Sequence, residues 1–101
     1  MSKNEIHNKY ALAKAIIEIS DTYGSDVANE ILYKFEECES DDDIQCVLIN
    51  WGSDEIFNEW GEFEFTKRMV DICVTLASYD VITRYTISYA NWSACCVIDF
   101  E

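Results

Sequence analysis

Carboxylate side chains are concentrated in one segment of the chain. Between residues 36 and 64 there are eleven acidic side chains and no Lys or Arg. They are Glu36, Glu37, Glu39, Asp41, Asp42, Asp43, Asp54, Glu55, Glu59, Glu62 and Glu64. Carboxylates can bind Lys and Arg, ligate a hard cation, or act as general acids and bases. Because exposed helices usually mix charges of both signs, the missing basic counterpart favours binding to a basic surface.

Metal binding and catalysis are the rival uses of these carboxylates, but the sequence lacks the residue spacing that either would require. The run Asp41-Asp42-Asp43 has neither the D-x-[DN]-x-[DN]-G pattern nor the later glutamate of a calcium loop, so we expect no metal site. The single histidine, His7, is not part of a Ser-His-Asp or Cys-His arrangement, and three scattered glycines form no phosphate-binding loop. No carboxylate pair stands out as a general acid and base. We therefore predict that the protein is not an enzyme and holds no cofactor.

Aromatic residues are interleaved with the acidic segment. Core packing is the first interpretation for each of them, but an exposed one would form a binding hot spot inside an acidic rim. Trp60 is the preferred candidate, because it sits on a short predicted helix between Gly52 and Gly61. The others are Trp51, Phe57, Phe63 and Phe65. The predicted partner-binding residues are therefore Trp60 and the eleven carboxylates.

The chain as a whole is strongly acidic. Twenty Asp and Glu against seven Lys and Arg give a formal net charge of −13 over 101 residues. Direct nucleic-acid binding is not expected, because phosphate contacts need Lys and Arg. No apolar run reaches the length of a membrane span, and residues 1–10 lack the apolar region of a signal peptide. We expect a cytoplasmic protein without membrane contact.

The five cysteines show no C-x-x-C spacing. They are Cys38, Cys46, Cys73, Cys95 and Cys96. In a cytoplasmic chain we expect them to be reduced and mostly buried thiols. Since successive residues of a strand point to opposite faces, Cys95 and Cys96 should lie on opposite sides of a sheet.

Two helices are predicted at the N-terminal end. Residues 2–5 fit a capping box that starts a helix over about 3–22, and Gly24 offers a left-handed stop. Ser25 or Asp26 can cap the second helix. The expected core faces are Ile6, Tyr10, Ala13, Ile16 and Ile17 in the first helix, and Val27, Ile31, Phe35 and Cys38 in the second.

Further helices are predicted in the middle of the chain. Residues 40–43 form a helix start, and apolar spacing of three and four residues from Ile44 to Trp51 favours a helix that ends at Gly52, although a buried strand over 44–49 is the rival interpretation. A short helix is expected over 53–60. A longer one over 65–79 would have Phe65, Met69, Ile72, Cys73 and Leu76 on its core face.

The pattern changes to period two after Tyr79. Alternating apolar residues predict strands over about 81–89 and 92–100, with Ala90-Asn91 as the turn. A lone hairpin is marginal in water, so this one should pack on the helices. The fold class expected for residues 1–101 is a single α+β domain, with four to five short helices followed by a C-terminal antiparallel β-hairpin.

In size, acidity and absence of catalytic motifs the chain resembles phage-encoded anti-restriction and anti-CRISPR proteins. That resemblance implies a non-enzymatic inhibitor, acting in a bacterial host cell, whose carboxylates stand in for phosphates (DNA mimicry). Its partner would be a basic nucleic-acid-binding protein, such as a CRISPR effector or a restriction enzyme. One alternative is an immunity protein that neutralises a toxin nuclease, and another is an acidic regulatory or structural module. The sequence also leaves a homodimer as an alternative to a monomer, because fourteen aromatic residues could cover more than one core.

Overall fold

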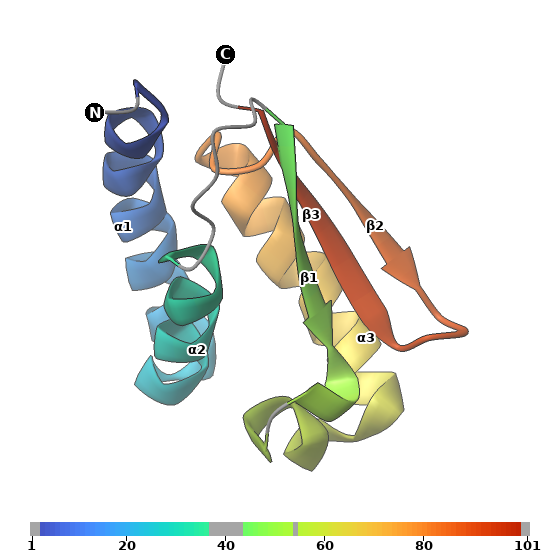
Figure 1. Ribbon diagram of the computed structural model, residues 1–101. Coiled ribbons are helices and arrows are strands. Elements are labelled where there is room, and N and C mark those ends of the chain that lie inside the picture. Colours follow the sequence, from blue (N-terminus) through green and yellow to red (C-terminus); the bar gives the residue numbers. More distant parts are fainter. Residues whose placement is uncertain (1–2, 37–43, 54, 100–101) are drawn as a thin grey trace.

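A computed structural model describes the backbone of residues 3–36, 44–53 and 55–99, and the side chains of residues 9–36, 44–52 and 55–98 (Figure 1). Two helices come first and pair with each other. A strand, a long helix and a β-hairpin follow. The elements are α1 (Lys3–Tyr23), α2 (Ser25–Glu36), β1 (Ile44–Asn50), the single 3-10 turn η1 (Trp51–Ser53), α3 (Glu55–Ser78), β2 (Arg84–Ser88) and β3 (Ser93–Asp99).

The turn between α1 and α2 forms where the sequence predicts it. Gly24 has φ 98° and its N–H donates to the carbonyl of Ser20 at 2.9 Å, which ends α1 with a left-handed residue. The buried side of α2 is also as predicted, with Val27, Ile31 and Phe35 in the core. The predicted contribution of Cys38 to this face lies outside the described residues.

The predicted core face of α1 is wrong for three of its residues. Tyr10 is 72% exposed, Ile17 is 64% exposed and Ala13 also faces solvent. Leu12, Ala15 and Ile19 are buried instead, and the predicted Ile16 is half-buried against them. Both sets of residues have helical spacing, so periodicity alone could not choose between them. Packing against α2 and α3 decides which set faces inward.

Residues 44–50 form a strand, which overturns the predicted helix and supports the rival interpretation. β1 pairs antiparallel with β3, with Val47 opposite Cys96 and Ile49 opposite Ala94. These four residues are buried. The apolar residues of this segment satisfy both periods, and the hydrogen-bonding partner supplied by β3 selects the strand.

The two predicted helices of the middle region are joined into one element. α3 runs from Glu55 to Ser78, but Gly61 interrupts it with φ 78° and ψ 162°. Glycine adopts this backbone without the steric penalty of a Cβ atom. The described residues therefore contain three α-helices and one 3-10 turn, rather than the four to five helices expected. The predicted face of the second segment is buried, from Phe65 to Leu76.

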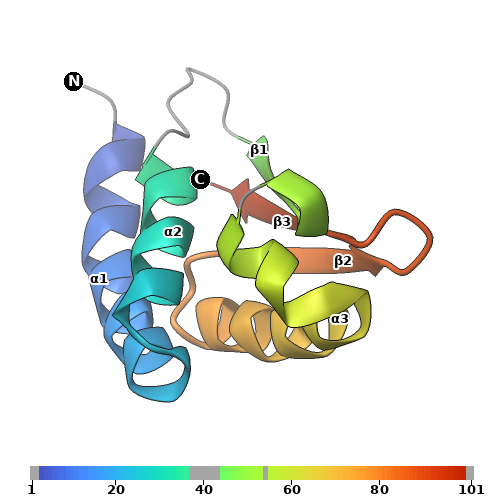
Figure 2. The same cartoon turned by 90° about the horizontal axis from the view of Figure 1, so that it is seen from below.

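A C-terminal antiparallel hairpin is present, but β2 covers Arg84–Ser88 rather than 81–89, β3 begins at Ser93, and residues 89–92 connect them instead of the predicted turn at Ala90-Asn91. The hairpin belongs to a three-stranded antiparallel sheet of order β1-β3-β2. Its central strand contributes Ala94, Cys96 and Ile98 to the core. Figures 1 and 2 show α3 running along one face of this sheet, with the α1–α2 pair to one side. The core thus lies between α3, the α1–α2 pair and one face of the sheet.

Candidate functional site

The structure describes six of the twelve predicted partner-binding residues. Glu36 is exposed at the end of α2. Five others lie on the first part of α3, namely Glu55, Glu59, Trp60, Glu62 and Glu64. The predicted residues Glu37, Glu39, Asp41, Asp42, Asp43 and Asp54 lie outside the described residues. The fold therefore gathers on one helix the acidic residues that follow the 3-10 turn.

Three of the α3 carboxylates are exposed and form no ion pair with another described side chain. Glu55 and Glu59 are four residues apart, which places their Cβ atoms about 5–6 Å from each other on a helix. Glu62 follows directly after the break at Gly61 and is also exposed. Within the described part of the chain, the only ion pair involves none of these three residues. Glu55 lies in the first turn of α3, where the helix dipole stabilises its charge, whereas Glu59 and Glu62 form no ion pair with a described side chain.

Glu64 differs from these three carboxylates, because it is paired. Its Oε2 accepts a hydrogen bond from Nε of Arg68 at 3.2 Å, one helical turn further on. Both side chains are about two-fifths exposed, at 39% for Arg68 and 41% for Glu64. An exposed pair of this kind contributes only about 0.3–0.5 kcal/mol to stability. Its main effect here is to neutralise the charge of Glu64 locally.

Trp60 is a packed side chain rather than a free one. Its ring centroid lies 5.4 Å from that of Phe57 in an edge-on contact and 6.0 Å from that of Tyr23. The guanidinium carbon of Arg68 lies 5.0 Å from the Trp60 ring centroid. A cation over an indole face is attracted by the ring quadrupole. Trp60 thus links the start of α3 to the end of α1, and it is half-buried.

Tyr23 extends this contact between α1 and α3. Its hydroxyl donates a hydrogen bond to Oδ2 of Asp71 at 2.6 Å. Burial, followed by this hydrogen bond and the Asp71 charge, raises the pKa of Tyr23 to about 12. The hydroxyl consequently stays protonated, and remains a donor, well above neutral pH. The contact holds α1 against α3 beside Trp60.

Phe63 is the exposed aromatic residue beside the acidic side chains. Its side chain is 74% exposed, whereas Phe57 and Phe65 are fully buried. Phe63 precedes Phe65 by two residues, which is about 200° around a helix, so the two must face opposite sides. That offset was a usable signal in the sequence, and it identifies Phe63 rather than Trp60 as the free aromatic residue. We call Glu55, Glu59, Glu62 and Phe63 the α3 patch.

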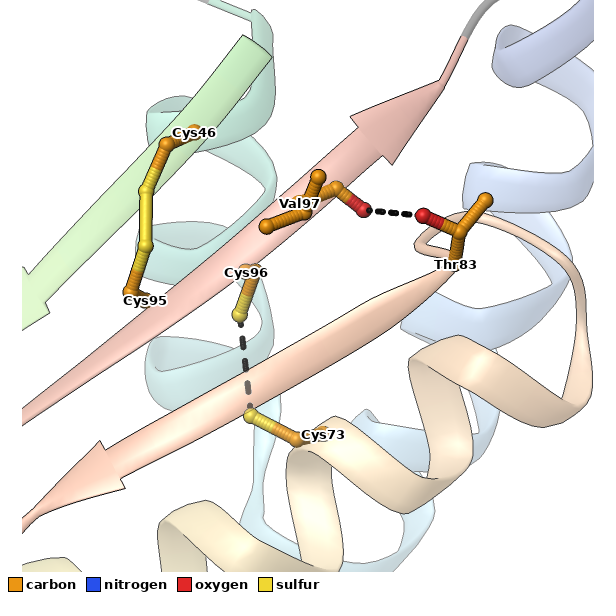
Figure 3. Close-up of a disulfide and its surroundings, with 6 residues drawn as sticks. All are labelled: Cys46, Cys73, Thr83, Cys95, Cys96 and Val97. Carbon is orange, nitrogen blue, oxygen red and sulfur yellow. Dashed lines mark hydrogen bonds between the residues drawn. A yellow bond between two sulfur atoms is a disulfide. The ribbon is translucent and has the colours of Figure 1, made fainter. Parts of the chain in front are cut away.

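The cysteines correct a further expectation, because two of them are oxidised. Cys46 on β1 and Cys95 on β3 form a disulfide with a Cα–Cα distance of 6.1 Å (Figure 3). It lies on the face of the sheet opposite α3, while Cys96 points to the core as the strand alternation predicts. Cys38 lies outside the described residues.

Cys73 and Cys96 are free thiols in the core, with their sulfur atoms 3.6 Å apart (Figure 3). The hydrogen bond between them, together with burial, raises the pKa of Cys73 well above its usual range. Because the thiolate is the reactive form, this thiol is unreactive at neutral pH. The pair therefore serves packing.

Among the side chains that the structure describes, no group of three or more His, Cys, Asp or Glu could hold a metal ion. No helix in the described ranges is both long and apolar enough to cross a membrane. Comparisons with protein-family models, curated proteins and solved structures find no match to this chain.

Proposed function

We propose that this protein is a non-enzymatic inhibitor that uses the α3 patch to bind a basic, nucleic-acid-binding partner protein and block its nucleic-acid site. The observation that carries the proposal is the composition of the patch. Three exposed carboxylates, none of which forms an ion pair with another described side chain, lie within eight residues of a large exposed aromatic ring in the sequence. A hydrophobic anchor inside a charged rim is the arrangement of a protein-binding hot spot.

The carboxylates of the patch contribute mainly to the rate and selectivity of binding. Their field extends over the Debye length of about 8 Å at physiological ionic strength. A surface rich in Lys and Arg is attracted from that distance, while an acidic surface is repelled. Each exposed pair formed at the rim adds only about 0.2–1 kcal/mol. Glu55 and Glu59, on successive turns of the first segment of α3, also offer a nucleic-acid-binding surface the anionic groups that it is built to accept.

Phe63 supplies the apolar part of the affinity. Burying a Phe side chain that is otherwise exposed contributes about 1.5–3 kcal/mol. At 74% exposure, about three quarters of that surface remains to be covered by a partner. We therefore expect the aromatic ring to set the dissociation rate, and the carboxylates to set the association rate and its dependence on salt.

Affinity capture from bacterial lysate tests this proposal. The baits are the wild type, a patch variant with Glu55→Gln, Glu59→Gln and Glu62→Gln, and the single variant Phe63→Ala. A matched control carries Asp26→Asn, Glu30→Gln and Asp80→Asn, which changes the net charge by the same amount elsewhere on the molecule. We expect a nucleic-acid-binding protein to be retained by the wild type and the control, and to be lost from the patch variant.

The identity of the captured protein decides the biological setting. A CRISPR effector or restriction enzyme supports an inhibitor of host defence, whereas a toxin nuclease supports an immunity protein. Equal capture by the wild type and the patch variant would contradict the proposed role of the α3 patch. A further bait with Asp41→Lys, Asp42→Lys and Asp43→Lys tests the predicted contribution of those residues.

A further inference from the structure

β2 is an edge strand whose outer edge is open in the described structure. The sheet order is β1-β3-β2, so β2 pairs with β3 alone. Its other edge presents backbone N–H and C=O groups to which no described strand is bonded. Such an edge is a template for another strand, and natural proteins commonly block it with charged residues or proline. β2 has a single charged residue, Arg84, at its first position.

α3 has an apolar flank that the described fold leaves partly uncovered. Val74 is 49% exposed, and Val70 and Ala77 are half-buried. Cys73 points to the sheet, because its sulfur meets that of Cys96 on β3 (Figure 3). At 100° per residue, the three apolar residues lie about 40–100° from Cys73, all on one side of it. We call Val70, Val74 and Ala77 the α3 flank.

The α3 flank and the open edge of β2 face the same side of the molecule. On the other side of Cys73 the helix has the buried Ile72 and then Arg68, whose guanidinium lies over the Tyr23 ring of α1. The α3 flank is therefore on the side away from α1. In the sheet, α2 packs against β1, and Figure 1 shows β2 as the strand furthest from the α1–α2 pair. A partner that reaches one of the two surfaces thus meets the other.

A second copy of the chain offers both a strand and an apolar helix flank in the same relative position. α3 packs against both β2 and β3, so its axis lies beneath the space between them. When two β2 strands pair at the usual spacing, the two α3 axes are two strand spacings, or roughly 10 Å, apart. Packed helices lie about 8–10 Å apart. The strand pair therefore brings the two α3 flanks together, whereas a lone extended peptide on β2 would leave the flank uncovered.

The charge distribution also favours a second copy at this place. The chain has a net charge of −13, but residues 81–98 contain no Asp or Glu and one basic residue, Arg84. This is the longest run of the sequence without an acidic residue. The residues of the α3 flank are likewise uncharged. Two copies therefore meet where the local repulsion between their carboxylates is smallest.

We propose that two copies of this chain pair antiparallel through β2, across a two-fold axis at Thr86, with the two α3 flanks packed beneath the joined sheet. This axis sets Thr86 beside its own copy and Tyr85 beside Ile87 of the other strand. Thr–Thr and aromatic–β-branched pairs are both favourable across antiparallel strands. Arg84 lies opposite the uncharged Ser88, so like charges do not meet. β2 is thus complementary to itself, as a two-fold interface requires.

The axis passes α3 at the level of its flank. Tyr85, the neighbour of Thr86, pairs with Cys96 in the sheet, and Cys96 meets Cys73 of α3. The α3 flank surrounds Cys73 in the sequence, so it lies beside the axis. The α3 patch lies on the N-terminal part of α3, about two turns or more before the flank, so the dimer does not require it.

The dimer is expected to be weak and reversible. A strand of five residues and one helix flank cover less area than the roughly 1,200 Å² of a standard stable interface. The charge of −13 on each copy opposes association at long range, and salt screens this repulsion. Dimerisation should therefore strengthen as salt rises, whereas the binding of a basic partner by the α3 patch should weaken. The opposite responses keep the two proposals separate.

Sedimentation equilibrium of the full chain, at protein concentrations up to about 1 mM and in about 0.15 M salt, tests the interface. We expect reversible dimerisation of the wild type. Val74→Asp should weaken it at least about tenfold, because each copy loses an apolar contact and buries a charge. The matched control Ile17→Asp changes a residue of α1 that is 64% exposed, and it should leave dimerisation unchanged. Circular dichroism verifies that each variant keeps its helices.

Substitution at the axis tests the register. Thr86 is exposed in the single chain, so Thr86→Lys and Thr86→Glu should both fold. Each sets like charges directly opposite each other and should weaken its own dimer at least about threefold. An equimolar mixture of the two variants should form a heterodimer within about threefold of the wild-type affinity. A wild type that stays monomeric, equal weakening by Ile17→Asp, assembly into species larger than a dimer, or a mixture that associates no better than the separate variants would each overturn the proposal.

Discussion

Reduction of the Cys46–Cys95 disulfide should lower the stability of the protein substantially without unfolding it. The bond joins β1 to β3, the central strand of the sheet. Without it, the two strands still pair through their backbone hydrogen bonds and through the buried side chains of the inner face. The native state therefore keeps its packing, and the main effect falls on the unfolded chain, which is no longer closed into a loop.

The magnitude follows from the length of that loop. The two cysteines are 49 residues apart in the sequence. The chain-entropy relation gives about 4 kcal/mol for closing a loop of this size at 25 °C, and measured values for disulfides are typically about 2–4 kcal/mol. We therefore expect reduction to lower the free energy of unfolding by about 2–4 kcal/mol. A domain of this size has a total stability of about 5–15 kcal/mol, so the reduced protein should remain folded.

Urea unfolding with and without a thiol reductant provides the assay. Since Cys46 is exposed, the reagent can reach the bond in the folded protein. The double variant Cys46→Ala/Cys95→Ala should match the reduced wild type and should show no further response to reductant. If the reductant leaves the unfolding midpoint of the wild type unchanged, the disulfide does not contribute as reasoned. A non-reducing peptide map should identify the linkage between Cys46 and Cys95 directly.

Three further predictions concern substitutions of single residues. Phe63→Ala should change the free energy of unfolding by less than about 0.5 kcal/mol, because the ring is exposed. Phe65→Ala should lower it by about 3–5 kcal/mol, because that ring is fully buried. Equal effects of the two substitutions in urea titrations would contradict the assigned burial. Gly61→Ala should lower the free energy of unfolding by about 1–2 kcal/mol, because φ is 78° at this position. The cost comes from the backbone conformation, since no atom would meet the added Cβ. Gly52→Ala, at a position without a positive φ, should be nearly neutral in the same assay. The raised pKa of Tyr23, about 12 against an ordinary value of 10.0, means that the unfolded chain loses this proton first. The contribution of Tyr23 to stability is therefore present below about pH 10 and is lost as the pH rises toward about 12. Tyr23→Phe should flatten this decline in the free energy of unfolding. A pH profile that is the same in the variant and the wild type would refute the prediction.

Features that depend on neighbouring residues were predictable from the sequence. The stop at Gly24, the buried face of α2, the buried face from Phe65 to Leu76 and the C-terminal hairpin all follow from local spacing, helix capping or turn chemistry. The surplus of carboxylates between residues 36 and 64 is likewise a property of composition. Each of these signals is complete within a window of one element, because helices and hairpins form their hydrogen bonds locally.

Features that depend on distant residues were decided by the tertiary structure. Residues 44–50 form a strand because β3, which lies about fifty residues further on, offers its backbone hydrogen bonds. The same pairing brings Cys46 next to Cys95, which no spacing rule indicated. In α1, two stripes of equal periodicity competed, and packing against α2 and α3 buried Leu12 and left Ile17 exposed.

The candidate site shows the same division between local and distant information. The acidic residues of α3 were identified from composition, but the choice of Trp60 as the exposed aromatic residue required knowledge of its neighbours. Tyr23 from α1 and Arg68 from the next turns of α3 cover the indole ring, while the break at Gly61 precedes an exposed Phe63. Sequence therefore determined the charge and the local elements. Side-chain exposure depends on contacts between elements far apart in the chain, so only the assembled fold decided it.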